Sequence, residues 1–151
     1  YIIPYDSSPR LLEDTAISKN RLLDELTNLK PKTVTIFLDT CFSGSTREND
    51  ALLAARPVSI VPKNLIIPDN FLIFSAASSD EIAIPLDEVK HGIFSYYLMK
   101  GMEGYADQNK DNKISSGELN SYIQENVLKQ TSGSQKPDLD GNFNKILIDF
   151  N

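Results

Sequence analysis

The chain has 151 residues, of which 40% are apolar, with a formal net charge of -6 and a pI near 4.7. This length can bury one core and is short for two, so we expect a single domain over residues 1–151. The excess of carboxylates argues against nucleic acid or an anionic membrane as a partner, since little would neutralise phosphates. No apolar stretch approaches the roughly 18 residues of a membrane span. Cys41 is the only cysteine, which excludes an internal disulfide and favours the cytoplasm.

The first half of the chain has the pattern of a helix, a buried strand and a long loop. Leucines at helical spacing predict an amphipathic helix over residues 18–29, with Ser18 as its cap and Pro31 as its stop. TVTIFLD, residues 33–39, is β-branched, aromatic and apolar on both faces, as in a central parallel strand. Residues 46–70 mix charges with prolines, which is typical of a long surface loop.

The second half continues this alternation. FLIFSAA, residues 71–77, repeats the buried-strand pattern. Apolar residues at helical spacing predict helices over 91–106 and 116–130, and NKILIDF, residues 144–150, predicts a last strand. Helices that alternate with buried strands indicate an α/β domain with a mostly parallel sheet flanked by helices.

Cys41 comes just after the carboxyl end of the first predicted strand, where open α/β sheets bind their ligands. Because side chains alternate along a strand, Asp39 and Cys41 should point to the same face. Ser43 and Gly44 allow a tight turn that would expose the sulfur and leave backbone N–H groups near it for an oxyanion. The alternative is a buried structural cysteine, the commoner fate of a lone cysteine.

A phosphatase is one of two chemistries that the cysteine loop allows. CFSGSTR, residues 41–47, matches C-x-x-G-x-x-R, in which backbone amides and Arg47 would bind a phosphate dianion. Thr40 stands where such loops usually have His or Val, and Glu48 would oppose an anion. The other chemistry is acyl transfer, in which a histidine activates the thiol and amides hold the oxyanion.

FLDTCFSGS, residues 37–45, resembles the nucleophile segment of caspase-like cysteine peptidases, in particular the bacterial and metacaspase-type branch with its apolar strand followed by D-x-C-x-S-G. Four more segments resemble parts of such domains in the same order, at residues 1–7, 71–83, 91–104 and 135–148. The resemblance covers most of the chain and implies the caspase-hemoglobinase fold.

By this resemblance Cys41 is the nucleophile of an endopeptidase, and amides around Cys41 and Gly44 belong to the oxyanion environment. The acid two residues before the cysteine lines the pocket for the residue before the cleaved bond, so Asp39 would receive an Arg or Lys side chain. Neighbouring parallel strands end on one rim, which implies that Ser78 and Asp80 also border the substrate cleft.

Elementary electrostatics favours the same role for Asp39. A bare carboxylate beside a thiolate raises the pKa of the cysteine and hinders attack, whereas a carboxylate neutralised by a cationic substrate does not. The hypothesis is therefore a substrate anchor, and the alternative is a strand-end carboxylate that caps local amides.

The general base is missing from the expected place. His91 is the only histidine, and although Gly92 follows it, the pair lies downstream of Cys41 and opens a helix. In caspase-like enzymes the catalytic His-Gly pair follows an apolar strand upstream of the cysteine, so we interpret His91 as structural or loop-forming. The base would lie before Tyr1 with the first strands of the sheet, on an N-terminal fragment of the same protein. A truncated chain and a catalytically inactive caspase-like scaffold are the alternatives.

The segment 46–70 matches in position the loop that caspase-like enzymes often cut during maturation, which implies a zymogen processed by autoproteolysis. Arg47 and Arg56 are the candidate processing sites, although Pro57 makes the bond after Arg56 a poor one. The alternative is an uncut loop.

DQNKDNKISSGE, residues 107–118, has the ligand spacing of an EF-hand loop. Asn112 stands where the pattern has glycine, and asparagine tolerates the left-handed backbone needed there. Three carboxylates around one point repel unless a cation joins them, so we expect a weak, single and unpaired Ca²⁺ site that stiffens the flanking helices or regulates activity. The alternatives are an acidic turn without an ion and a module whose function is calcium binding alone, and no organic cofactor is expected. The expected ligands are Asp107, Asn109, Asp111, the Lys113 carbonyl, Ser115 through water, and Glu118.

Overall fold

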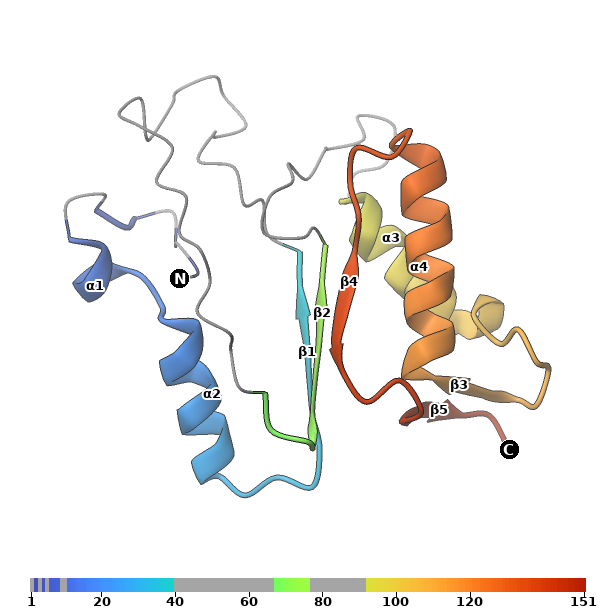
Figure 1. Ribbon diagram of the computed structural model, residues 1–151, viewed down its shortest axis with the longest axis horizontal. Coiled ribbons are helices and arrows are strands. Elements are labelled where there is room, and N and C mark those ends of the chain that lie inside the picture. Colours follow the sequence, from blue (N-terminus) through green and yellow to red (C-terminus); the bar gives the residue numbers. More distant parts are fainter. Residues whose placement is uncertain (1, 3, 5, 9–10, 40–66, 77–91) are drawn as a thin grey trace. The chain divides into compact units, whose positions relative to one another are not determined.

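The computed structural model describes residues 2, 4, 6–8, 11–39, 67–76 and 92–151 (Figure 1). These residues form two compact units. The first contains the described residues up to Lys32 together with Ile67 and Pro68, and the second contains the described residues of 33–39, 69–76 and 92–151.

The first unit contains the helices α1 (Leu12–Thr15) and α2 (Lys19–Asn28). Ser18 caps α2, because its side chain accepts a hydrogen bond of 3.4 Å from a backbone N–H in the first turn. Lys30 has φ of 52°, so the helical conformation ends before Pro31. The helix expected over 18–29 is confirmed, whereas α1 was not predicted.

The second unit contains a three-stranded sheet made of β1 (Val34–Leu38), β2 (Phe71–Ser75) and β4 (Asp138–Gly141), in the order β1-β2-β4. β1 and β2 are parallel, with Val34 opposite Phe71 and Leu38 opposite Ser75, and β4 is antiparallel to β2. The parallel pair was predicted from the sequence. β4 was not predicted, because its sequence DLDG has the composition of a turn.

The central strand of this sheet is β2, and all five of its residues are buried. β1 was expected to be central but is only half-buried, and Phe37 on it is 38% exposed. The difference arises because β2 has a neighbour on each side, whereas β1 pairs with β2 alone within the described residues. Phe37 still contacts the Phe74 ring across the pair, at 5.2 Å between centroids.

The other elements of this unit are α3 (Ile93–Lys100), the π-helical turn η1 (Gly101–Tyr105), β3 (Lys113–Ser115), α4 (Ser116–Gln130) and β5 (Ile146–Asp149). α4 has the bounds that its apolar spacing predicts. The helix expected over 91–106 is α-helical to Lys100 and then widens, and it reaches φ of 116° at Gly104. β5 pairs with β3 in a second, antiparallel sheet instead of joining the main one.

One cluster of buried side chains joins the main sheet to α3 and α4, which lie side by side in Figure 1. Leu72 and Phe74 belong to this cluster and alternate along β2 with Phe71 and Ile73, so both helices pack on the same face of the strand. The helices contribute Ile93, Phe94, Leu119, Ile123 and Val127. Among the described helices, none combines the length and apolar character needed to cross a bilayer.

Gly141 at the end of β4 provides a test of the sheet. Its φ is 128°, and a Cβ at this position would lie 2.5 Å from the Phe71 carbonyl oxygen. Alanine would therefore require both an unfavourable backbone and a shift of β4 away from β2. We predict that Gly141→Ala lowers the free energy of unfolding by about 2–4 kcal/mol, measured by urea denaturation.

The matched control is Gly133→Ala. Gly133 also has a positive φ, 82°, but a Cβ there would meet nothing within 4 Å. Gly133→Ala should lower the free energy of unfolding only by the cost of a side chain at positive φ, about 1 kcal/mol. Equal losses for the two variants would contradict the close approach of β4 to β2.

Candidate functional site

The carboxyl ends of β1 and β2 lie side by side at one edge of the main sheet. Leu38 is opposite Ser75, and the Ala76 backbone N–H donates a hydrogen bond of 2.8 Å to the Leu38 carbonyl oxygen. The chain leaves these two strands at the same edge, after Leu38 and after Ala76. The shared rim expected from the sequence is therefore confirmed for the strand ends themselves.

Gln135 holds this edge from a third segment of the chain. Its side chain is 1% exposed, and its Nε2 donates a hydrogen bond of 2.8 Å to the Ala76 carbonyl oxygen. Ala76 is fully buried, so losing this donor would leave its carbonyl without its side-chain partner. The sequence assigned no role to Gln135, and the only signal was its place in the segment 135–148 that resembles caspase-like domains.

Asp39 follows β1 directly and is exposed at this edge. Its Oδ2 accepts a hydrogen bond of 2.6 Å from the Ser95 hydroxyl, which lies in the first turn of α3 and 56 positions later in the chain. Gly92, the residue before α3, packs against the same carboxylate, and a Cβ there would lie 3.1 Å from Asp39 Cγ. The carboxylate is therefore held between the end of β1 and the start of α3.

Most other residues predicted for this site lie outside the described residues. This applies to the proposed nucleophile Cys41, to Gly44, to Ser78 and Asp80, which were expected to border the substrate cleft, and to His91. It also applies to the processing site Arg47 and to most of the segment 46–70. Asp39 is thus the predicted site residue whose surroundings are described at this edge.

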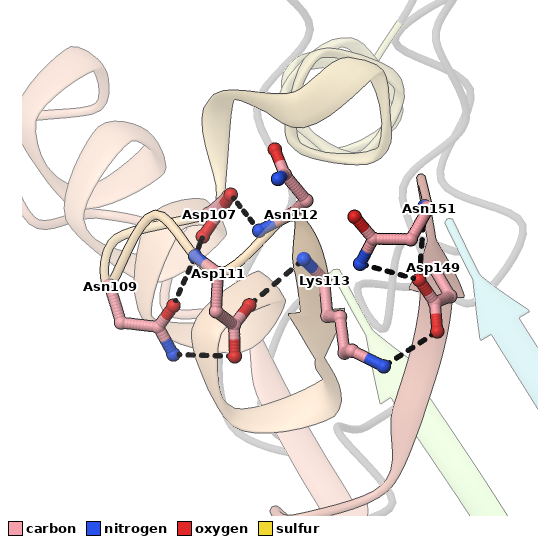
Figure 2. A network of polar contacts seen from close by, with 7 residues as sticks. All are labelled: Asp107, Asn109, Asp111, Asn112, Lys113, Asp149 and Asn151. Carbon is pink, nitrogen blue, oxygen red and sulfur yellow. Dashed lines mark hydrogen bonds and ion pairs between the residues drawn. The ribbon is translucent and has the colours of Figure 1, made fainter.

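Residues 107–118 form a second constellation, in which polar side chains turn onto the loop's own backbone (Figure 2). The Asp111 backbone N–H donates to Asp107 Oδ1 at 3.2 Å and to Asn109 Oδ1 at 2.8 Å. The Asn112 N–H donates to Asp107 Oδ2 at 3.0 Å, and the Lys113 N–H donates to Asp111 Oδ1 at 2.9 Å. Oxygens of the first and third loop residues thus converge on one N–H group.

The backbone of this loop has the conformation that the sequence predicted at its sixth position. Asn112 has φ of 63°, in the left-handed region, and Lys110 two residues before it has φ of 62°. Asparagine adopts this region more readily than other residues with a side chain, so the loop forms without the usual glycine.

Glu118 lies in the first turn of α4 and is the last residue of the loop. Its Oε2 accepts hydrogen bonds from the Ser115 backbone N–H at 2.9 Å and from the Ser115 hydroxyl at 2.7 Å, and its own N–H donates to that hydroxyl. This capping box stabilises the start of α4. These bonds stabilise the ionised carboxylate and lower the pKa of Glu118. The Ser115 backbone N–H is the main cause, and the backbone N–H groups of Asn109 and Gln108 contribute.

The loop is tied to the C-terminal strand through β3. Ile114 is fully buried opposite Ile148, and the Lys113 ammonium forms an exposed ion pair of 2.7 Å with Asp149 (Figure 2). The hydrogen bond within this pair raises the pKa of Lys113 and lowers the pKa of Asp149. A lysine ammonium has no lone pair to offer a cation, so Lys113 could bind one in the loop only through its carbonyl, the group predicted from the sequence.

Within the described part of the chain, no three His, Cys, Asp or Glu side chains gather closely enough to hold a metal ion. The carboxylates of Asp107, Asp111 and Glu118 instead accept hydrogen bonds within the loop. A carboxylate has about four lone-pair sites, so each retains acceptor capacity beyond these bonds. The Ca²⁺ ligands named from the sequence remain a prediction.

Comparison with known proteins gives the family. No curated protein matches the sequence. The family model of the caspase domain matches residues 1–147, which is almost the whole chain. The α/β architecture, with helices packed on a small mixed sheet, is consistent with that fold. The chain therefore belongs to the caspase-domain family of cysteine peptidases.

Proposed function

We propose that the chain supplies the nucleophile and the substrate-binding carboxylate of an endopeptidase that cleaves proteins after Arg or Lys. The observation that carries this proposal is the position of Asp39, exposed at the carboxyl edge of β1 and two residues before Cys41 in a caspase-domain sequence. A carboxylate at an open strand end is available to a cationic side chain, and an arginine can bind it through two parallel hydrogen bonds.

In the proposed reaction the Cys41 thiolate attacks the carbonyl carbon of the bond after the bound Arg or Lys. The carbonyl oxygen becomes an oxyanion, which backbone N–H groups around Cys41 and Gly44 stabilise. The amine leaves with a proton from a histidine, and water then hydrolyses the acyl-enzyme and regenerates the thiol. Ser78 and Asp80, which follow β2 in the sequence, are proposed as further contacts to the substrate.

The histidine is proposed to come from an N-terminal fragment of the same protein. Within the described residues β1 pairs with a strand on one side only, so a further strand could pair with its other edge. A strand parallel to β1 at that edge would bring a residue at its carboxyl end to the same rim as Asp39. Cleavage after Arg47 is proposed as a processing step of a zymogen, and the lone cysteine favours the cytoplasm as the place of action.

Active-site labelling tests this proposal. We expect a peptidyl-arginine acyloxymethyl ketone to add one label to the full-length protein and none to Cys41→Ala, as seen by intact mass. Asp39→Asn keeps the shape of the side chain but removes its charge, so labelling should slow by about tenfold or more.

Different outcomes identify the rival functions. If the ketone does not label the protein and vanadate, a phosphate analogue, protects Cys41 from a general thiol-alkylating reagent, the function is that of a phosphatase in which Arg47 is essential. An unreactive Cys41 in a folded protein that binds neither probe would indicate a catalytically inactive scaffold.

We propose in addition that residues 107–118 bind Ca²⁺. The support is the convergence of Asp107 and Asn109 oxygens on one N–H group, together with the left-handed Asn112. The ion would be held by the side chains of Asp107, Asn109, Asp111 and Glu118 and by the Lys113 carbonyl, with Ser115 acting through water. Bound Ca²⁺ would neutralise the carboxylates of the loop and stiffen the start of α4.

Thermal unfolding with added Ca²⁺ tests whether residues 107–118 bind the ion. A weak EF-hand site has a Kd of roughly 10⁻⁴–10⁻³ M, and ten times that concentration stabilises the folded state by about 1.4 kcal/mol. We predict a corresponding rise in Tm for the wild type and none for Glu118→Gln, because glutamine can keep the capping box but loses the carboxylate. An equal rise in both proteins would contradict binding at this loop.

A further inference from the structure

We propose that Ser95 is a positioning residue for Asp39 and sets the preference of the site for a cationic side chain. This inference rests on the proposed function, in which the Asp39 carboxylate receives the Arg or Lys of the substrate. It adds a residue of α3 that neither the sequence pattern nor the family match assigns.

The hydrogen bond between the two side chains has the geometry of a strong contact. The Ser95 Oγ lies 2.6 Å from Asp39 Oδ2, in the range for a hydroxyl that donates to an ionised carboxylate. Asp39 is exposed and follows the last residue of β1, so without this bond its side chain would occupy several rotamers. Of its two oxygens, Oδ2 alone accepts a side-chain hydrogen bond within the described residues. Both oxygens keep acceptor capacity for a substrate guanidinium, because each carboxylate oxygen has about two lone-pair sites.

The serine is carried by a rigid element. Ser95 is half-buried in the first turn of α3, directly after Ile93 and Phe94, which are both 1% exposed in the core. Those two side chains fix the start of the helix and therefore the Ser95 backbone, and the bond to Asp39 selects one rotamer of the Ser95 hydroxyl. The Asp39 carboxylate is therefore bonded to a side chain whose backbone is held in place by the core.

Gly92 restricts the same carboxylate from another side. It has φ of -56° and ψ of 142°, a conformation open to any residue, so its importance here is the space it leaves. A Cβ at this position would overlap Asp39 Oδ2 and lie 3.1 Å from both Cγ and Oδ1. Alanine would thus displace the carboxylate, the movable end of a short side chain, while the backbone stays in place.

A carboxylate that only caps α3 is the competing interpretation, because Asp39 also lies near the positive end of that helix. The two interpretations predict different measurements. A cap contributes to stability and affects all substrates alike, whereas a positioned anchor affects only substrates that carry the positive charge.

The test compares two peptides in the full-length protein that differ only in the residue before the cleaved bond, arginine or its neutral isostere citrulline. Ser95→Ala should lower kcat/KM for the arginine peptide by about tenfold, mainly through KM, and leave the citrulline peptide within about twofold. Gly92→Ala should also lower kcat/KM for the arginine peptide more than for the citrulline peptide. Ser95→Thr keeps a hydroxyl and should restore the preference, and Ser121→Ala, at an exposed serine of α4, should change neither peptide.

Failure of the positioning role and failure of the proposed function give different results. The positioning role is overturned if Ser95→Ala lowers kcat/KM equally for both peptides. It is also overturned if Ser95→Thr does not restore the preference for arginine. If Asp39→Asn abolishes the arginine preference but Ser95→Ala does not reduce it, the inference fails and the proposed function stands. If the wild type cleaves neither peptide, or Asp39→Asn keeps the preference, the proposed function fails and the inference falls with it.

Discussion

The pairing of β2 on both of its sides is the constraint on which the candidate site depends. β2 is buried along its whole length, with β1 parallel on one side and β4 antiparallel on the other. Its alternate side chains Leu72 and Phe74 belong to the core cluster with α3 and α4. The same strand therefore sets the edge at which Asp39 emerges and the face on which α3 packs, and the contact between Asp39 and α3 follows from both.

The sequence predicted the elements whose identity lies in a local pattern. α2, α4 and β2 are long or apolar enough for periodicity to identify them, and the left-handed Asn112 followed from a spacing of ligands. β4 escaped prediction because DLDG becomes a strand only by pairing with β2. The bond between Ser95 and Asp39 escaped because the two residues are 56 positions apart and neither stands in a motif that names the other. Tertiary packing decides such features, and local residue patterns do not contain it.

The acidic loop illustrates which contacts stabilise a segment strongly and which contribute little. The ion pair between Lys113 and Asp149 is short but exposed, and such pairs contribute little because water and salt screen them. Burying Ile114 completely contributes more, about 1.5–3 kcal/mol, and the pairing of β3 with β5 adds backbone hydrogen bonds. The loop is therefore held mainly by its apolar eighth residue and by β5, and less by the charges that make it conspicuous in the sequence.

The close packing of Gly92 on the Asp39 carboxylate has a consequence for how this sequence can change. Any side chain at position 92 would occupy space that the carboxylate now fills. Position 92 can therefore accept a larger residue only if position 39 loses its acid or the carboxylate adopts another rotamer, in which case Ser95 loses its acceptor. An acid at position 39 that is bonded to Ser95 therefore requires glycine at position 92, so the residues at positions 39, 92 and 95 should covary in other members of the family.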